Sequence, residues 1–263
     1  MADELFLKRI VFQVPGMEAV QVRRNIVYHR LKDGAEMKMD IYPPPDLAEG
    51  ERRPAVVFIH GGPIPPGLDA KNLGLFKSYG ELIAASGFVG VTFGYRYESL
   101  GTLAAGARQV EAAFTYVREH AAEFGVDTDR LAAWFFSGGG PQLAPFLRNR
   151  PAGVRCLLAY YTVLDLEPLR KDVPENQVER FSPVASFAPG EYEGPPILVA
   201  RAGLDKPFMN AGIDAFVTRA LAANATLDVM NHPRGEHGFD VLNDDARSRE
   251  IIARSLDFLR THL

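Results

Sequence analysis

Short apolar runs alternate with segments of helical periodicity along most of the chain. Apolar residues at positions 107, 110, 114, 117, 121 and 124 recur in steps of three and four, which places them on one face of a helix. Residues 213–221 repeat this spacing. A last apolar stripe follows residues 243–245, Asn-Asp-Asp, which are types that favour a helix N-terminus. The pattern therefore predicts helices over 101–125, around 213–221 and after residue 245.

Eight further segments have the composition of β-strands. The first two alternate polar and apolar residues and flank Lys32-Asp33-Gly34, a turn sequence, which predicts an antiparallel hairpin. The later ones are apolar on both faces, as strands buried between two layers of helices are. The segments are 20–28, 36–42, 54–59, 88–93, 131–136, 154–161, 196–200 and 226–230. The alternation predicts an α/β fold with a mostly parallel central sheet, an antiparallel N-terminal edge and helices on both faces.

Length and charge narrow the class of protein. The 263 residues are 47% hydrophobic and 24% charged, enough for a substantial core, and we predict one domain over residues 1–263. The formal net charge is −4 and no basic tract of five residues occurs, so no nucleic-acid partner is predicted. The apolar runs are far shorter than the roughly 20 residues that cross a bilayer, so no membrane partner is predicted either. The oligomeric state is not predicted.

The cysteine content and the N-terminus predict a cytoplasmic protein. The one cysteine, Cys156, cannot form an internal disulfide. Residues 1–10 lack a basic segment followed by a long apolar stretch, which a secretory signal would have. Cys156 lies near the start of the strand expected at 154–161, which predicts a buried small hydrophobe and not a nucleophile.

One stretch, residues 165–195, breaks the alternation of strands and helices. It is charged and contains five prolines. A long irregular segment inside a compact domain is often functional. We expect a small cap or long loop over a site after the sixth strand, and a plain surface excursion fits the composition equally well.

Ser137 joins an apolar strand directly to the glycine-rich turn 138–140 and a helix expected over 142–148. This order suits a nucleophilic hydroxyl, because a sharp turn exposes Oγ above the sheet and directs the next amide at a developing oxyanion. Ser78 and Ser99 also precede a glycine by two residues. Ser78 lies in a helical stretch and Ser99 lies well past the end of its strand, so Ser137 is the candidate nucleophile.

His60-Gly61-Gly62-Pro63 directly follows the strand at 54–59. Glycines there let the backbone approach a bound carbonyl and turn an N–H toward it. Pro63 has no N–H to donate. The candidate oxyanion donors are therefore Gly62 and Gly138, with Gly61 as a further candidate, although glycine-rich loops after strands are also common turns.

An acid and a histidine follow the last two predicted strands. Asp205 comes after the strand at 196–200 and His237 after the strand at 226–230. The chain order Ser, Asp, His is that of a nucleophile-elbow hydrolase, and all of these elements fall at the carboxyl ends of strands, where open α/β sheets bind ligands. Asp165 is an alternative acid. His232, His237 and Asp240 have the residue types of a metal site, but no helix places both imidazoles on one face, so no metal is predicted.

Four motifs together resemble the α/β-hydrolase superfamily, nearest its esterase and dienelactone-hydrolase-like branch. They are His60-Gly-Gly-Pro63, Ser137-Gly-Gly139, Gly203-Leu-Asp205 and His237-Gly-Phe239. The resemblance covers nearly the whole chain. It implies an α/β-hydrolase fold with Ser137 as nucleophile, His237 as general base and acid, Asp205 as the carboxylate that orients the imidazole, and Gly62 with Gly138 as oxyanion hole. Tyr95-Arg96 resembles the tyrosine-arginine pair of carboxylesterases, for which we expect a structural role.

The resemblance implies a serine hydrolase that cleaves a small-molecule carboxylic ester through an acyl-enzyme, without a cofactor. Aromatic candidates for the substrate pocket are Phe136, Tyr160, Tyr161 and Phe208. An amidase or peptidase-like hydrolase is an alternative, because His-Gly-Gly-Pro also resembles the prolyl-oligopeptidase group. A non-catalytic ligand-binding hydrolase scaffold is another.

The chain departs from the family pattern at two points. The residue two positions before the nucleophile is usually small, and here it is Phe135. A bulky side chain there strains the turn by roughly 1–3 kcal/mol unless its neighbours make room. In addition, dienelactone hydrolases use a cysteine nucleophile, whereas this chain has Ser137.

Overall fold

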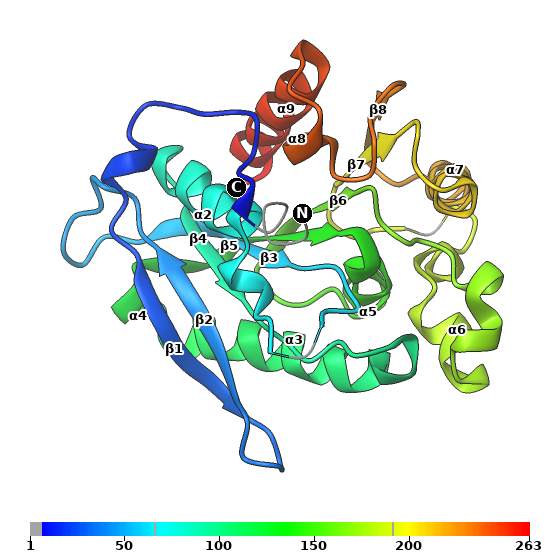
Figure 1. Cartoon of the computed structure of the whole chain (residues 1–263), viewed down its shortest axis with the longest axis horizontal. Helices are drawn as coiled ribbons and strands as arrows, with labels where there is room; N and C mark the ends of the chain where they lie inside the picture. Colours follow the sequence, from blue (N-terminus) through cyan, green and yellow to red (C-terminus); the bar gives the residue numbers. More distant parts are fainter. Residues whose placement is uncertain (1–6, 66, 191) are drawn as a thin grey trace.

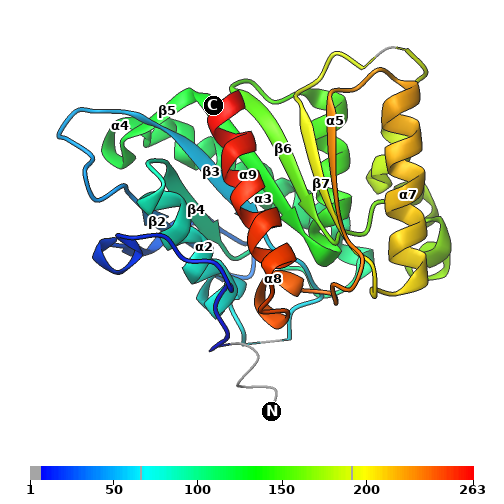
Figure 2. The ribbon, with the colours of Figure 1, turned by 90° about the horizontal axis from the view of Figure 1, so that it is seen from above.

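The computed structural model describes residues 7–65, 67–190 and 192–263, which form a twisted sheet between two layers of helices (Figures 1 and 2). The sheet order is β1-β2-β4-β3-β5-β6-β7-β8. β1 and β2 pair antiparallel, as do β2 and β4, and every later pairing is parallel. The strands are β1 (Arg23–Arg30), β2 (Glu36–Tyr42), β3 (Arg53–Ile59), β4 (Val89–Phe93), β5 (Val126–Phe136), β6 (Val154–Tyr160), β7 (Ile197–Ala202) and β8 (Leu227–His232). The predicted α/β class and its antiparallel N-terminal edge are confirmed.

Helices cover both faces of the sheet, as the two-sided apolar strands require. α2, α8 and α9 pack on one face, and α3, α4, α5 and α7 pack on the other (Figure 1). The helices are α2 (Gly74–Ala85), α3 (Leu103–Glu119), α4 (Ala121–Phe124), α5 (Leu143–Asn149), α6 (Glu175–Phe181), α7 (Pro207–Ala222), α8 (Phe239–Leu242) and α9 (Ala246–His262). Asp245 caps α9, because its side chain accepts a hydrogen bond from the Ser248 amide at 2.8 Å.

Several element boundaries differ from the sequence pattern, and two of these differences have a clear physical reason. β5 begins at Val126, five residues before the apolar run, because residues 127–130 are only partly buried and so lack an apolar signature. The helix expected over 101–125 breaks at His120 into α3 and α4, and Gly125 ends α4 in a left-handed conformation with φ 66°.

Residues 165–195 form short helices at one end of the molecule, beside α5 and α7 (Figure 1). They comprise the 3₁₀ turn Glu167–Asp172, α6 and the 3₁₀ turn Pro183–Ser186. Arg148 of α5 holds α6 in place by donating hydrogen bonds to the carbonyl oxygens of Glu179 and Arg180. The segment therefore packs on α5 and α7, which belong to the helix layer that also contains α3 and α4.

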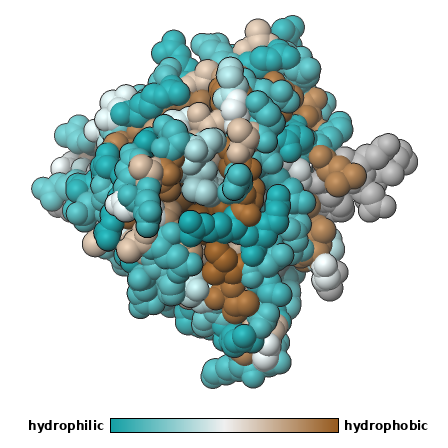
Figure 3. Space-filling model, turned by 90° about the vertical axis from the view of Figure 1, so that its left-hand side faces the viewer, coloured by the Kyte–Doolittle hydropathy of each residue, from teal (hydrophilic) through white to brown (hydrophobic). Residues whose placement is uncertain are grey.

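The surface seen from the β1–β2 side is mainly hydrophilic, with hydrophobic residues exposed over a smaller central area (Figure 3). Among the described residues, no helix combines the length and the apolar composition that crossing a bilayer requires. A cytoplasmic location and a single domain over the whole chain stay predictions.

Candidate active site

Ser137 occupies a tight turn between β5 and the 3₁₀ segment Ser137–Gln142. Its φ of 52° is uncommon for a residue other than glycine. The turn packs closely on its surroundings, since a Cβ added to Gly140 would lie 2.2 Å from the Val163 carbonyl oxygen. Only glycine fits that position. The turn lifts the Ser137 side chain above the carboxyl end of the sheet, which is the geometry of a nucleophile elbow.

His237 and Asp205 meet Ser137 at this edge of the sheet. Ser137 Oγ lies 2.8 Å from His237 Nε2, and His237 Nδ1 lies 2.7 Å from Asp205 Oδ2. The Asp205 side chain is almost fully buried, and its other oxygen accepts a hydrogen bond from the Lys206 amide at 2.7 Å. A carboxylate facing Nδ1 favours the tautomer that carries a proton there, which leaves Nε2 free to accept the Ser137 proton. The three residues form one continuous hydrogen-bonded chain.

The segment carrying Gly61 and Gly62 packs directly against Ser137 and Gly138. A Cβ on Gly138 would lie 3.1 Å from the Gly62 nitrogen, and one on Gly61 would lie 2.7 Å from the Ser137 Cβ. Larger side chains at Gly61 or Gly138 would separate the two segments. The backbone amides of Gly62 and Gly138 therefore lie close together beside Ser137, where a tetrahedral oxyanion would need donors.

A cavity of about 320 Å³ opens at Ser137 and His237. Among the described residues, no lysine, arginine, aspartate or glutamate lines it. Its other walls are Gly61, Gly62, Pro63, Ile64, Leu73, Leu75, Phe76, Phe136, Tyr161, Gly238, Val241 and Leu242. Phe136 and Tyr161 lie where the sequence prediction put them. Tyr160 and Phe208 do not line this cavity: the Tyr160 hydroxyl is buried against Ser255 Oγ at 2.7 Å, and Phe208 packs against the core beneath α7.

This chain is similar in sequence and in structure to known proteins. The family model for BD-FAE matches residues 39–149, a range that includes the Gly61–Gly62 segment and Ser137. The esterase Est2 from Thermogutta terrifontis superposes with a TM-score of 0.76 at 23% sequence identity, covering 94% of each chain. The chain has the α/β-hydrolase fold. The same neighbour has been solved with butyrate bound, with a TM-score of 0.76, and phosphoramylated by tabun, with a TM-score of 0.75.

Curated relatives of this chain include esterases and a lipase. Esterase LipQ of Mycobacterium tuberculosis is 26% identical over 255 residues, which covers 86% of this chain and 59% of LipQ. A secreted lipase of Arthroderma benhamiae is 29% identical over 173 residues, covering 57% of this chain and 34% of the lipase. The chain thus spans less than two thirds of the length of these relatives. The relatives and structures named above do not point to the dienelactone-hydrolase-like branch, which stays a prediction.

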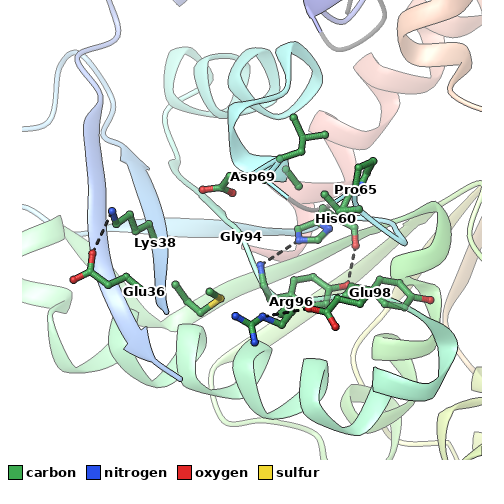
Figure 4. A pocket seen from close by; sticks show the side chains of 15 residues that line it. Glu36, Lys38, His60, Pro65, Asp69, Gly94, Arg96 and Glu98 are labelled. Carbon is green, nitrogen blue, oxygen red and sulfur yellow. Dashed lines mark hydrogen bonds and ion pairs between the residues drawn. The ribbon is translucent and has the colours of Figure 1, made fainter. Parts of the chain in front are cut away.

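His60 braces the Gly61–Gly62 segment, a role that the sequence analysis did not assign. Its Nδ1 faces the Gly61 carbonyl oxygen, and its Nε2 accepts a hydrogen bond from the Tyr95 amide at 3.2 Å (Figure 4). The Tyr95 hydroxyl donates to the His60 carbonyl at 2.9 Å, and the two rings stack at 4.1 Å. Burial lowers the pKa of His60 to about 4, so the ring is neutral at pH 7 and its Nδ1 proton is free to bond Gly61. Tyr95 therefore has the structural role expected of it.

A second cavity, of about 380 Å³, shares Ile64 with the first and is lined by His60 (Figure 4). Ser137 and His237 do not line it. Its charged side chains are paired with each other or with neighbours: Lys38 with Glu36, Arg96 with Glu98 and Asp33, and Asp69 with Lys71. The candidate catalytic residues line the apolar cavity instead.

The alternative residues lie apart from His237. Asp165 accepts hydrogen bonds from the Glu167 amide at 2.9 Å and the Ser182 hydroxyl at 3.2 Å. His232 Nε2 faces Asp245 Oδ1 at 3.2 Å and Ser248 Oγ at 3.1 Å. Neither Asp165 nor His232 has His237 as a hydrogen-bond partner. None of the described residues between 165 and 195 lines either cavity, and the cap expected there stays a prediction.

Phe135 is accommodated without disturbing the elbow. It is fully buried, and its ring meets that of Phe146 edge to face at 5.2 Å. Its partner in the register of β6 is the small Ala159, and the Ser137–His237 hydrogen bond is intact. Cys156 lies buried in β6, and burial raises the pKa of its thiol to about 12, so it is not a nucleophile.

Truncation of Phe135 is expected to cost stability and not activity. Phe135→Ala leaves a cavity beside Phe146 and should lower the free energy of unfolding by about 3–5 kcal/mol. Because the ring does not displace Ser137, turnover per folded molecule should change less than about twofold. Urea unfolding and active-site titration measure the two quantities. Phe124→Ala, a buried phenylalanine of α4 far from Ser137, is the matched control; a severalfold rise in turnover in Phe135→Ala alone would show that the ring impairs the elbow.

Proposed function

We propose that this α/β-hydrolase is a serine esterase that hydrolyses a small carboxylic ester through an acyl-enzyme. The observation that carries the proposal is the hydrogen-bonded chain from Ser137 Oγ through His237 to the buried Asp205, which opens into an apolar cavity. Esterase relatives and a structural neighbour that binds butyrate and reacts with tabun support it. The hydrogen bond between Ser137 and His237 also favours an enzyme over a non-catalytic scaffold.

In the proposed mechanism, Ser137 Oγ attacks the ester carbonyl carbon while His237 Nε2 takes the hydroxyl proton. The carbonyl oxygen becomes an oxyanion, which the amides of Gly62 and Gly138 stabilise, with Gly61 as a further candidate donor. The alcohol leaves with the proton from His237, and the acyl group stays on Ser137. A water molecule then gives a proton to His237 and attacks the acyl carbon. The bond between that carbon and Ser137 Oγ breaks, Oγ takes the proton back from His237, and the carboxylic acid is released. No cofactor enters the scheme.

The lining of the cavity indicates an uncharged acyl chain. Among the described residues around it there is no lysine, arginine, aspartate or glutamate. A carboxylate at the end of the acyl chain would lose its hydration without gaining a partner, which costs several kcal/mol. An apolar chain would instead gain contacts with Leu73, Leu75 and Phe76.

We therefore expect nitrophenyl pentanoate to be hydrolysed with a kcat/KM about 100-fold above that of the nitrophenyl monoester of glutaric acid, which has the same length and a terminal carboxylate. Leu75→Arg should narrow this ratio about tenfold by supplying a cation at the cavity wall. Leu221→Arg, at an exposed position of α7, is the matched control. Equal rates for the two esters would show that the acyl chain binds outside the apolar cavity. The corresponding nitroanilide tests amide hydrolysis in the same assay.

A further inference from the structure

A buried carboxylate lies three residues after His237. Asp240 is fully buried in α8, and both of its oxygens accept hydrogen bonds from buried phenols. Tyr79 of α2 donates to Oδ2 at 2.7 Å, and Tyr161 donates to Oδ1 at 2.8 Å. Burial raises the pKa of Asp240 to about 6, while the two hydrogen bonds and the nearby His237 act in the opposite direction. Burying a carboxylate costs free energy, and the proposed mechanism gives Asp240 no chemical role.

Tyr161 connects this carboxylate to the active site. Its ring lines the cavity and meets the His237 ring edge to face, with 4.8 Å between ring centroids and 62° between ring planes. Its φ of 39° is unusual for an aromatic residue, so the surroundings must hold it there. Two contacts do so: the Tyr161 amide donates to the Ala200 carbonyl at 2.8 Å, and the hydroxyl donates to Asp240.

We propose that Asp240 is a positioning residue of the active site, which acts through Tyr161 on the ring plane of His237. The inference rests on the proposed serine esterase function. His237 must keep Nδ1 toward Asp205 and Nε2 toward Ser137 at the same time. The ring of Tyr161 blocks one direction of imidazole rotation, and the hydrogen bond to Asp240 keeps that ring in place. Without this bond, the imidazole spends less time aligned with Ser137, which lowers the rate of proton transfer and leaves substrate binding unaltered.

Tyr161→Phe tests the inference, because it removes only the hydroxyl that bonds Asp240 and keeps the ring against His237. We expect kcat for nitrophenyl butyrate to fall about tenfold while KM changes less than twofold. Tyr160→Phe is the matched control. It removes the adjacent buried phenol, which bonds Ser255 and neither lines the cavity nor contacts Asp240, so its kcat per folded molecule should stay at the wild-type value.

Asp240→Leu removes both acceptor oxygens at similar side-chain size and should lower kcat to a similar extent. The double variant Asp240→Leu/Tyr161→Phe should then be no slower than the slower single variant, because both changes break the same connection. Rates are expressed per folded molecule from active-site titration. The inference is overturned if Tyr161→Phe has the kcat of Tyr160→Phe, or if the losses in the double variant multiply.

Labelling of the wild type separates this inference from the proposed function. A wild-type protein that neither hydrolyses esters nor reacts with a fluorophosphonate probe would overturn the esterase proposal itself. A wild type that is labelled at Ser137 and active, together with a Tyr161→Phe variant of unchanged kcat, would overturn only the role of Asp240.

Discussion

Ser137→Ala is expected to lower kcat for nitrophenyl esters by about 10⁶-fold, the scale found when a serine protease loses its nucleophile. The reason is chemical, because alanine offers no atom to which the acyl group can transfer. The fold should be retained, since the Ser137 hydroxyl bonds only His237 and its backbone carbonyl still accepts from the Val163 amide at 3.0 Å. Initial rates measure the loss, and a fluorophosphonate probe with peptide mapping identifies the labelled residue.

Ser99→Ala is the matched control, because Ser99 also precedes a glycine by two residues and lines neither cavity. Its rate and labelling should equal those of the wild type. Labelling that persists in Ser137→Ala, or that maps to Ser78 or Ser99, would place the nucleophile elsewhere. Ser78 is an improbable site on structural grounds, since its hydroxyl is buried and donates to the Gly74 carbonyl at 2.7 Å.

The sheet and the ends of its strands could be predicted because the information is local. A two-sided apolar run predicts a buried strand wherever it occurs, and the carboxyl ends of parallel strands meet at one edge. Ser137 follows such a run directly and Asp205 follows one by a few residues, while His237 follows β8, an edge strand of which only the last residue is buried. Their convergence therefore follows from the order of elements, without knowledge of any side-chain contact.

The walls of the cavity depend on long-range packing and could not be predicted in the same way. Tyr160 and Tyr161 are adjacent aromatics at the end of β6, and the sequence does not say which one faces the cavity. The positive φ of Tyr161 turns its ring toward His237, whereas Tyr160 stays on the sheet and points at α9. Leu73, Leu75 and Phe76 reach the cavity from the start of α2, a helix with no motif of its own.

The same limit applies to the cap expected over residues 165–195, which stays a prediction. Prolines and charge in 165–195 mark irregular structure, but nothing in that composition says which surface it covers. The position of this segment depends on long-range contacts. Arg148 donates hydrogen bonds to carbonyl oxygens of α6, and Phe181 is buried in the core. The lining of the apolar cavity comes instead from segments around Ile64, Leu75 and Val241, which are far apart in the sequence.

The supporting roles of the buried residues His60 and Asp240 could not be predicted from the sequence either. His60 carries the motif expected of an oxyanion segment, yet its ring serves as a brace whose function depends on the Tyr95 amide, 35 residues away. Asp240 depends on Tyr79, 161 residues away. A polar residue in an apolar segment signals that a partner exists, but the partner is found only in three dimensions.

Asp205→Asn is expected to lower kcat by about 10⁴-fold, the effect of the same change in the serine-protease triad. The structure supplies the reason. Asp205 Oδ1 accepts from the Lys206 amide while Oδ2 faces His237 Nδ1, so an asparagine keeps its carbonyl oxygen toward Lys206 and turns its NH₂ toward the imidazole. Nδ1 must then accept, and the ring proton moves to Nε2, where it prevents uptake of the Ser137 proton.

The measurement is kcat at pH 8 for nitrophenyl butyrate, with folded protein quantified by far-UV circular dichroism. Asp165→Asn is the matched control, because Asp165 also follows a strand and bonds the Ser182 hydroxyl instead of a histidine. We expect it to keep wild-type turnover. If Asp165→Asn greatly lowers kcat while Asp205→Asn leaves kcat nearly unchanged, Asp165, after the end of β6, is the acid of the site instead of Asp205. It would also require His237 to leave the position in which its Nδ1 lies 2.7 Å from Asp205.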